Sequence, residues 1–196
     1  MTSLRPTSFR AVLDANVLVM AGPRDTLLRA AEDGLYRALW SEAILDEVRR
    51  NLIRLLEERG LSGPADRVDY LLYRLRRAFP EALVEGYEGL VPVMTNQEKD
   101  RHVLAAAVVG GAQVIVTENL RDFPSIALAP YGIEAQSPDE FLLHLLDLDP
   151  EGMVRIMREQ GAQMQTPRTI NEILDGLAPQ LPQFIASVRQ LIGGLG

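Results

Sequence analysis

The stretch Arg10-Ala-Val-Leu-Asp-Ala-Asn-Val-Leu-Val-Met20 holds a short apolar run that a single carboxylate, Asp14, interrupts. Gly22 and Pro23 follow it. An apolar run of this length, bounded by turn residues, predicts a buried β-strand that ends near Asp14. A buried carboxylate without a partner would cost several kcal/mol. We therefore expect Asp14 to be paired, hydrogen-bonded or bound to a metal ion.

Strand-like and helix-like segments alternate from this stretch to residue 136. Two further strands are predicted at residues 35–40 and 112–117. Helices are predicted at residues 24–33, at 42–60 with Ser41 as N-cap, at 64–79, and at 101–109 after a capping box at 95–98. Such alternation predicts an α/β fold, in which a parallel sheet of about five strands lies between helices. Ligands of such a sheet bind at the carboxyl ends of its strands.

The pattern changes at Ser137-Pro-Asp-Glu140, which is a capping box with proline at the first helical position. No strand-like run follows it, and apolar residues recur at helical spacing between prolines and glycines. We predict an α/β domain over residues 1–136 and a helical extension over residues 137–196. The extension holds eight acidic residues and four arginines, which favours packing or protein contacts over nucleic-acid binding.

The composition excludes several kinds of site. The 196 residues include no cysteine and two histidines, so neither a disulfide nor a zinc site rich in cysteine or histidine can form. Any metal ion must then be a hard cation that carboxylates hold. The net charge of −7 argues against a surface that coats nucleic acid, but it does not exclude a nuclease with a local basic rim. The sequence has no apolar run of membrane-spanning length and no signal peptide, which predicts a cytoplasmic protein.

Polar side chains occur where a parallel sheet builds its site. These are Asp14 at the first strand end, Glu47 on the helix that follows the second strand, Asp100 at a helix start, and Asn119 or Asp122 after the third strand. Each has a structural alternative, because Glu47 shares its helix with solvated acids and a carboxylate in a first helical turn is favoured by the helix dipole. Among the remaining residues, His102 is expected to point to another side of its helix.

Four segments together resemble the acidic motifs of PIN domains. They are Val12-Leu-Asp-Ala-Asn-Val17, Ser41-Glu-Ala-Ile-Leu-Asp-Glu-Val48, Asp100-Arg-His-Val-Leu-Ala-Ala-Ala107 and Val116-Thr-Glu-Asn-Leu-Arg-Asp-Phe-Pro124. The resemblance covers about residues 10–136. In the fourth segment, Asn119 stands where many members carry aspartate, and the next aspartate is Asp122. This Thr-x-Asn-Leu-x-Asp-Phe-Pro pattern is similar to that of one subgroup of the family.

The resemblance implies a VapC-like toxin ribonuclease that hydrolyses RNA with Mg²⁺ or Mn²⁺. It implies that Asp14, Glu47 and Asp100 are metal ligands and catalytic residues, with Asn119 and Asp122 as further catalytic candidates. Asn16, Thr117, Arg24, Arg101 and Arg121 are the candidates for substrate contacts. The implied partners are the RNA substrate, an antitoxin protein and a second copy of the chain in a homodimer, with no membrane.

Two other functions remain open at this stage. A catalytically weak PIN-like module would bind RNA or protein without cleaving it. A phosphatase of the haloacid dehalogenase type would also carry Asp14 at the end of its first strand and could use Lys99, but Asn16 replaces the second aspartate of that class. For the extension, one alternative is a cap on the domain core, and the other is a docking face that exposes Phe184, Ile185, Val188 and Leu191. The cluster Arg74, Arg76 and Arg77 is either a solvated helix face or a guide for substrate.

Overall fold

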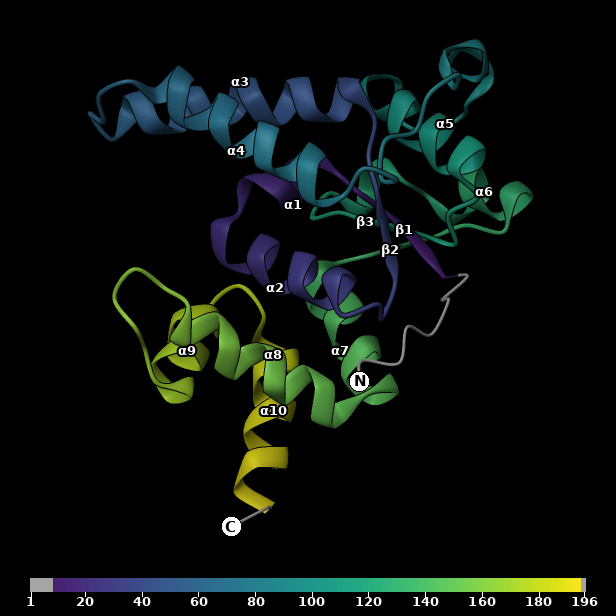
Figure 1. Cartoon of the computed structure of the whole chain (residues 1–196). Coiled ribbons are helices and arrows are strands. Elements are labelled where there is room, and N and C mark those ends of the chain that lie inside the picture. Colours follow the sequence, from purple (N-terminus) through teal and green to yellow (C-terminus); the bar gives the residue numbers. More distant parts are fainter. Residues whose placement is uncertain (1–8, 195–196) are drawn as a thin grey trace.

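The computed structural model of the protein describes residues 9–194, and its centre is a four-stranded parallel sheet (Figure 1). The strands are β1 (Arg10–Leu13), β2 (Arg37–Leu39), β3 (Val114–Val116) and β4 (Glu134–Gln136), in the order β2-β1-β3-β4. Val12 lies opposite Leu39 on one side and Ile115 on the other. The two central strands are buried on both faces, which explains why their sequences are continuously apolar.

Fourteen helical elements in the described part of the chain connect and cover this sheet. The α-helices are α1 (Ala15–Val19), α2 (Ala21–Glu32), α3 (Glu42–Glu58), α4 (Pro64–Ala78), α5 (Arg101–Gly110), α6 (Ser125–Leu128), α7 (Pro138–Leu148), α8 (Pro150–Ala162), α9 (Ile170–Leu177) and α10 (Pro182–Gly194). The 3₁₀ turns are η1 (Glu88–Val93), η2 (Glu98–Asp100), η3 (Leu120–Asp122) and η4 (Ala129–Tyr131). The predicted α/β class is confirmed.

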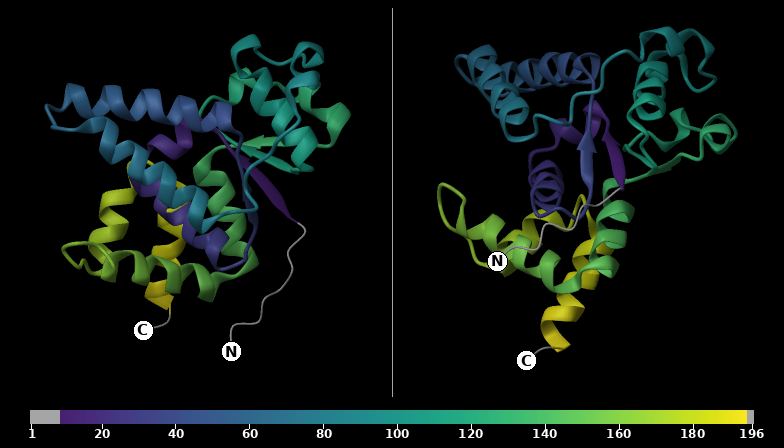
Figure 2. Two further views of the ribbon diagram at one scale, coloured as in Figure 1. Left: turned by 45° about the horizontal axis from the view of Figure 1, so that its top comes forward. Right: turned by 45° about the vertical axis from the view of Figure 1, so that its right-hand side comes forward.

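Helices lie on both sides of the sheet, with α5 on one side and α2 on the other (Figure 2). Helices α3 and α4 form an antiparallel pair beside them. Helix α3 begins with the predicted N-cap, because the Ser41 hydroxyl accepts a hydrogen bond from the Ile44 amide. Two ion pairs join the two helices. Arg49 Nε lies 2.7 Å from Asp69 Oδ1, and Arg76 Nη2 lies 2.6 Å from Glu42 Oε2.

The sheet of residues 9–194 has four strands rather than about five. At the outer side of β2, the backbone of Trp40 bonds to Ala82 and Val84, and Trp40 forms an isolated parallel bridge with Leu83. This contact occupies the place of a fifth strand. It stops after one bridge because the chain turns at Gly86, whose φ of 75° only glycine adopts at low cost, and then enters η1.

The start of α5 also differs from the prediction. No capping box forms at residues 95–98; the turn η2 precedes the helix instead. The Asn96 side chain points inward and donates to the Asp100 carbonyl at 3.0 Å, and the Gln97 amide donates to the Asp122 carbonyl at 3.2 Å. This stretch is therefore fastened to the loop after β3, and that tertiary contact replaces the local cap.

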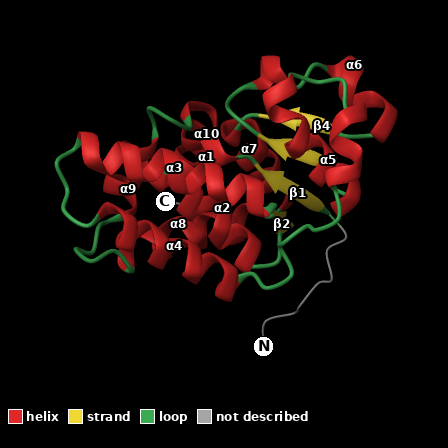
Figure 3. Ribbon diagram, turned by 90° about the horizontal axis from the view of Figure 1, so that it is seen from above, coloured by secondary structure: helices red, strands yellow, loops and turns green. Residues whose placement is uncertain are grey.

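Helices α7 and α8 pack against α2, and α9 and α10 pack onto α7 and α8. Figure 3 shows these C-terminal helices from above. The predicted capping box at Ser137 and Glu140 is present and starts α7. A buried hydrogen bond of 2.8 Å runs from the Thr26 hydroxyl on α2 to Gln160 Oε1 on α8. Residues of both segments belong to one continuous hydrophobic core.

The alternative that Phe184, Ile185 and Val188 form an exposed docking face is wrong. All three side chains are fully buried, whereas Leu191 is 36% exposed. The start of α10 is fixed by Asp139 of α7, whose carboxylate accepts from the amides of Gln183 and Phe184. This N-terminal cap comes from a different helix, which turns the apolar side of α10 onto α7.

Candidate functional site

All four strands of the sheet point the same way, so their carboxyl ends meet at one edge. In the sheet order β2-β1-β3-β4, the chain leaves β1 toward β2 at one edge of the sheet and leaves β3 toward β4 at the opposite edge. The connections that follow β1 and β3 therefore lead in opposite directions, and open α/β sheets bind ligands at such a point. Asp14 follows β1 and Thr117 follows β3, so both residues lie at this point.

Asp14 is buried, and it accepts three hydrogen bonds at this edge. Its Oδ1 accepts from the Ala15 amide at 2.7 Å, as the N-cap of α1. Its Oδ2 accepts from the Thr117 hydroxyl at 2.7 Å and from Asn16 Nδ2 at 2.8 Å. The Thr117 hydroxyl thus joins the end of β3 to the end of β1 across 103 positions of sequence.

Asn16 fastens the loop after β3 to the same carboxylate. Its Nδ2 also lies 3.0 Å from Thr117 Oγ1, and its Oδ1 accepts from the Glu118 amide at 3.1 Å. The Asn119 amide in turn donates to Thr117 Oγ1 at 3.1 Å. Because every polar atom in this network has a partner, the position of Asp14 is tightly constrained.

Burial raises the pKa of the Asp14 carboxyl group. The hydrogen bonds from Thr117 and Ala15 oppose this effect, and the negative charge of Glu47 adds to it. The protein therefore holds a carboxylate whose charged form is disfavoured unless a cation is close.

Lys99 lies between two other buried carboxylates. Its Nζ is 2.9 Å from Asp122 Oδ2 and 3.4 Å from Asp100 Oδ2. Asp122, after β3, thus reaches the same cation as Asp100 at the start of α5. The Lys99 contact lowers the pKa of Asp122, whereas burial raises the pKa of Asp100.

Glu47 lies on α3, half-buried, and contacts α5. Its Oε1 is 3.1 Å from His102 Nε2, and this hydrogen bond lowers the pKa of the Glu47 carboxyl group. His102, which was expected to be a surface or packing residue, thus contacts one of the predicted site residues. Lys99 contacts Asp100 and Asp122, and His102 contacts Glu47.

These acidic groups influence one another's ionisation. The charge of Glu47 raises the pKa of Asp14, and the charges of Asp14 and Asp122 raise the pKa of Asp100. Asp100 Oδ2 is buried, and no residue in the described chain gives it a bond of hydrogen-bond geometry. The same oxygen is 3.4 Å from Lys99 Nζ, so it already attracts a cation, and buried carboxylate oxygens of this kind suit a hard divalent cation. Within residues 9–194, no three acidic, histidine or cysteine side chains form a ready-made metal-binding group.

The remaining predicted residues occupy different positions. Asn119 is half-buried at the N-cap of η3. Arg121 is exposed beside Asp122, at 3.7 Å, and Arg101 Nε lies 3.5 Å from the Asn96 carbonyl. Arg24 lies on α2, where its guanidinium donates to the Leu18 carbonyl at 2.7 Å. Arg24 also lines a cavity of about 700 Å³ between α2, α4, α8 and α9. Its side chain therefore lies among these helices rather than in the Asp14 network.

Sequence reasoning missed Lys99 and His102 as members of this edge. The signal for Lys99 was present, because it is the single lysine of the chain and directly precedes Asp100. His102 gave no comparable signal, because its contact with Glu47 spans 55 positions and depends on how α3 packs beside α5.

Among the helices of residues 9–194, none combines the length and the apolar character that a membrane span requires.

Comparison with known proteins assigns most of the chain to two families. Residues 10–121 match the family "PIN domain", and residues 138–190 match the "VapC50 C-terminal domain". A Mycobacterium tuberculosis protein named "Putative ribonuclease VapC50" is 48% identical over 111 residues, which are 56% of this chain and 66% of that protein. The match thus spans slightly less than two thirds of the relative's length. No solved structure matches this chain.

The matched PIN region includes Asp14, Glu47, Asp100, Thr117 and Asn119, and it covers more than half of the chain. Together with the parallel sheet and its acidic carboxyl edge, this match shows that the chain belongs to the PIN domain family.

Proposed function

We propose that the protein is a metal-dependent endoribonuclease that hydrolyses RNA phosphodiester bonds. The observation that carries this proposal is the buried Asp14 carboxylate, which Thr117 and Asn16 hold at the carboxyl edge of a parallel sheet. Membership of the PIN domain family and the likeness to a protein named as a putative ribonuclease add support.

The metal ligands in this proposal are Asp14, Glu47 and Asp100, and the cation is Mg²⁺ or Mn²⁺. When bound, such an ion supplies a water of lowered pKa and charge that stabilises the phosphoryl transition state. Lys99 lies closer to Asp122, at 2.9 Å, than to Asp100, at 3.4 Å, so Asp122 shares its positive charge. Asn119 faces the substrate from the loop after β3.

The side chains around the ligands have positioning roles. Thr117 and Asn16 hold the Asp14 carboxylate with hydrogen bonds of 2.7 and 2.8 Å. His102 holds Glu47 in the same way from α5. Arg101 and Arg121 stand beside these residues and contact RNA phosphates, for which a guanidinium offers paired donors. Arg24 stays a weaker candidate for such a contact, because its guanidinium is bonded to the Leu18 carbonyl.

We further propose that the chain acts as the toxin of a toxin–antitoxin pair in the cytoplasm, as a homodimer. The relative is named as a putative ribonuclease, which supports this class of activity. The family match at residues 138–190 extends the likeness to the C-terminal helices. In this proposal residues 1–136 form the nuclease domain, and residues 137–196 form a helical extension that stabilises it through α2.

The test is cleavage of a labelled single-stranded RNA by the full chain, with Mn²⁺ and with a chelator. We expect cleavage only with the metal ion, and a loss of at least about a hundredfold in Asp14→Asn. Asp147→Asn, which changes an exposed acid of α7, is the matched control and should cleave normally. If the wild-type protein binds this RNA but cleaves it under neither condition, the alternative of a PIN-like binding module is correct.

A further inference from the structure

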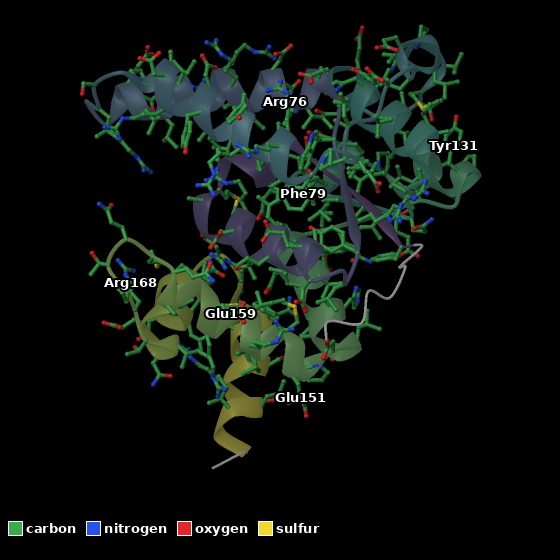
Figure 4. The ribbon with its side chains drawn as sticks, in the orientation of Figure 1. Arg76, Phe79, Tyr131, Glu151, Glu159 and Arg168 are labelled. Carbon is green, nitrogen blue, oxygen red and sulfur yellow. The ribbon has the colours of Figure 1, made fainter. Side chains whose placement is uncertain are left out.

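The solvent side of α4 carries a group of aromatic and cationic residues that the proposed cleavage site does not use. Val68, Leu72 and Leu75 bury the inner side of the helix. One flank is committed to α3 through the ion pairs of Asp69 and Arg76. Arg76 is labelled in Figure 4. The opposite side presents five exposed residues, which we call the α4 outer face: Arg67, Tyr70, Tyr73, Arg74 and Arg77.

The two tyrosines of the α4 outer face are unusually open to solvent. Tyr70 is 63% exposed and Tyr73 is 55% exposed. They lie three positions apart, so their rings project from the same side of the helix. No exposed large aliphatic residue of α4 accompanies them. A protein-binding helix face usually offers aliphatic anchors at this spacing, whereas this face offers flat rings.

The arginines of the α4 outer face lack acidic partners. Arg76 is paired with Glu42, but within residues 9–194 no carboxylate lies within ion-pair distance of Arg67, Arg74 or Arg77. Arg77 Nη1 instead lies 3.4 Å from the Tyr73 hydroxyl. One acid, Asp66, shares this side of the helix. In a chain of net charge −7, the face is thus a local concentration of positive charge.

Rings beside unpaired guanidinium groups suit one class of ligand. Bases of a single strand stack on exposed aromatic rings, and arginines hold the phosphates between them. A duplex keeps its bases stacked inside and would leave the rings unused. The ten positions from Arg67 to Arg77 rise about 15 Å along the helix axis, which is long enough for a short run of nucleotides.

The ion pairs between α3 and α4 place α4 alongside the helix that carries Glu47. Arg76 meets Glu42, and Asp69 meets Arg49, so the middle of α4 runs alongside the segment 42–49 of α3. That segment carries Glu47. A strand held on α4 would therefore lie on the helix next to the one that supplies a proposed metal ligand.

We propose that the α4 outer face binds single-stranded RNA outside the carboxylate site and so increases the affinity for substrates longer than the cleaved dinucleotide. The identity of the nucleic acid as RNA rests on the proposed ribonuclease function. The binding itself depends on stacking and phosphate contacts and needs no metal ion.

The test is fluorescence anisotropy with a labelled twelve-nucleotide oligouridylate, measured with chelator so that no cleavage occurs. The double variant Tyr70→Ala with Tyr73→Ala should raise the Kd at least about tenfold. The triple variant Arg67→Gln, Arg74→Gln and Arg77→Gln should weaken binding and reduce the slope of log affinity against log salt by about 2.

A matched control removes three exposed arginines elsewhere, as Arg54→Gln, Arg158→Gln and Arg189→Gln, and should change the Kd less than threefold. Unchanged affinity in both α4 variants, or an equal loss in the control, would overturn the proposal. If only the sedimentation profile changes in the tyrosine variant, the face is an interface between copies of the chain, and the proposal is again wrong.

A dinucleotide cleavage assay separates this proposal from the proposed function. The α4 variants should cleave a dinucleotide at the wild-type rate, because that substrate does not reach α4. If no form of the protein cleaves RNA but the α4 variants still lose oligonucleotide affinity, the ribonuclease proposal fails and the binding face stands. If the wild-type protein does not bind the oligonucleotide, the binding face itself is refuted.

Discussion

The ammonium nitrogen of Lys99 lies 2.9 Å from Oδ2 of Asp122, so the single lysine of the chain neutralises an acid at the edge where metal binding is proposed. The same nitrogen is 3.4 Å from Asp100 Oδ2. This contact keeps the metal-free edge from accumulating the full negative charge of its carboxylates.

Replacing Lys99 with methionine should weaken the metal-free protein and strengthen its response to metal. Lys99 is 59% exposed, so solvent screens the ion pair and its loss should cost no more than about 1 kcal/mol. The uncompensated charge should then attract a divalent cation more strongly. Thermal melting with and without Mn²⁺ measures both effects, and Lys99→Arg is the control. A smaller Mn²⁺-induced shift in Lys99→Met than in wild type would refute this role.

Asp14→Asn should raise the free energy of unfolding of the metal-free protein near neutral pH. Burial raises the pKa of Asp14, so the folded state binds this proton more tightly than the unfolded state does. Stability associated with Asp14 therefore falls as pH rises above 3.8, the ordinary pKa of an aspartate, and through the higher pKa of the folded state. The advantage of the asparagine variant should shrink as pH is lowered through that window. Urea denaturation at several pH values measures the difference in the free energy of unfolding between Asp14→Asn and wild type. A difference that grows toward acid pH would contradict this prediction.

His102→Ala should raise the pKa of Glu47. The hydrogen bond from His102 is the largest cause of the lowered value, and its removal leaves the opposing effect of burial. A carboxyl-carbon NMR titration of Glu47 in the metal-free protein reports this directly. His102→Gln, which can still donate to Glu47, should restore part of the shift. Equal Glu47 pKa values in wild type and His102→Ala would show that the 3.1 Å contact has no electrostatic consequence.

Two glycines of the C-terminal helices should respond oppositely to alanine. At Gly161 a Cβ would lie 2.5 Å from the Arg168 carbonyl oxygen, so Gly161→Ala should cost about 1–3 kcal/mol. At Gly176, on α9, a Cβ would meet nothing within 4 Å, and Gly176→Ala should stabilise by up to about 1 kcal/mol. Chemical denaturation of the full chain compares them. Similar stability of both variants would show that the turn after α8 is not packed as described.

Local sequence signals were enough to predict much of the fold. The continuous apolar strands, the Ser41 N-cap and the Ser137 capping box follow from short patterns, and the structure has each of them. The failures lie where a distant contact replaces a local rule. The capping box expected at residues 95–98 gives way to bonds with Asp122, and the fifth strand is reduced to one bridge at Trp40.

For the site, too, local signals identified some residues and distant contacts decided the others. Asp14 stood out because a carboxylate inside an apolar strand demands a partner, and the structure provides Thr117 and Asn16. The contact of His102 with Glu47 could not be read from spacing, because neither residue's neighbours reveal how α3 and α5 pack. The same limit applies to the tail, where the apolar pattern of α10 did not tell whether its stripe faces α7 or solvent.

The most direct test of the central claim is an anomalous difference map from crystals of the full chain grown with Mn²⁺, recorded at the manganese absorption edge. The account predicts a peak within coordination distance of carboxylate oxygens from Asp14 and Asp100, with Glu47 as a further ligand. A map at saturating Mn²⁺ that has no peak at this edge, or a peak held by other residues only, would contradict it.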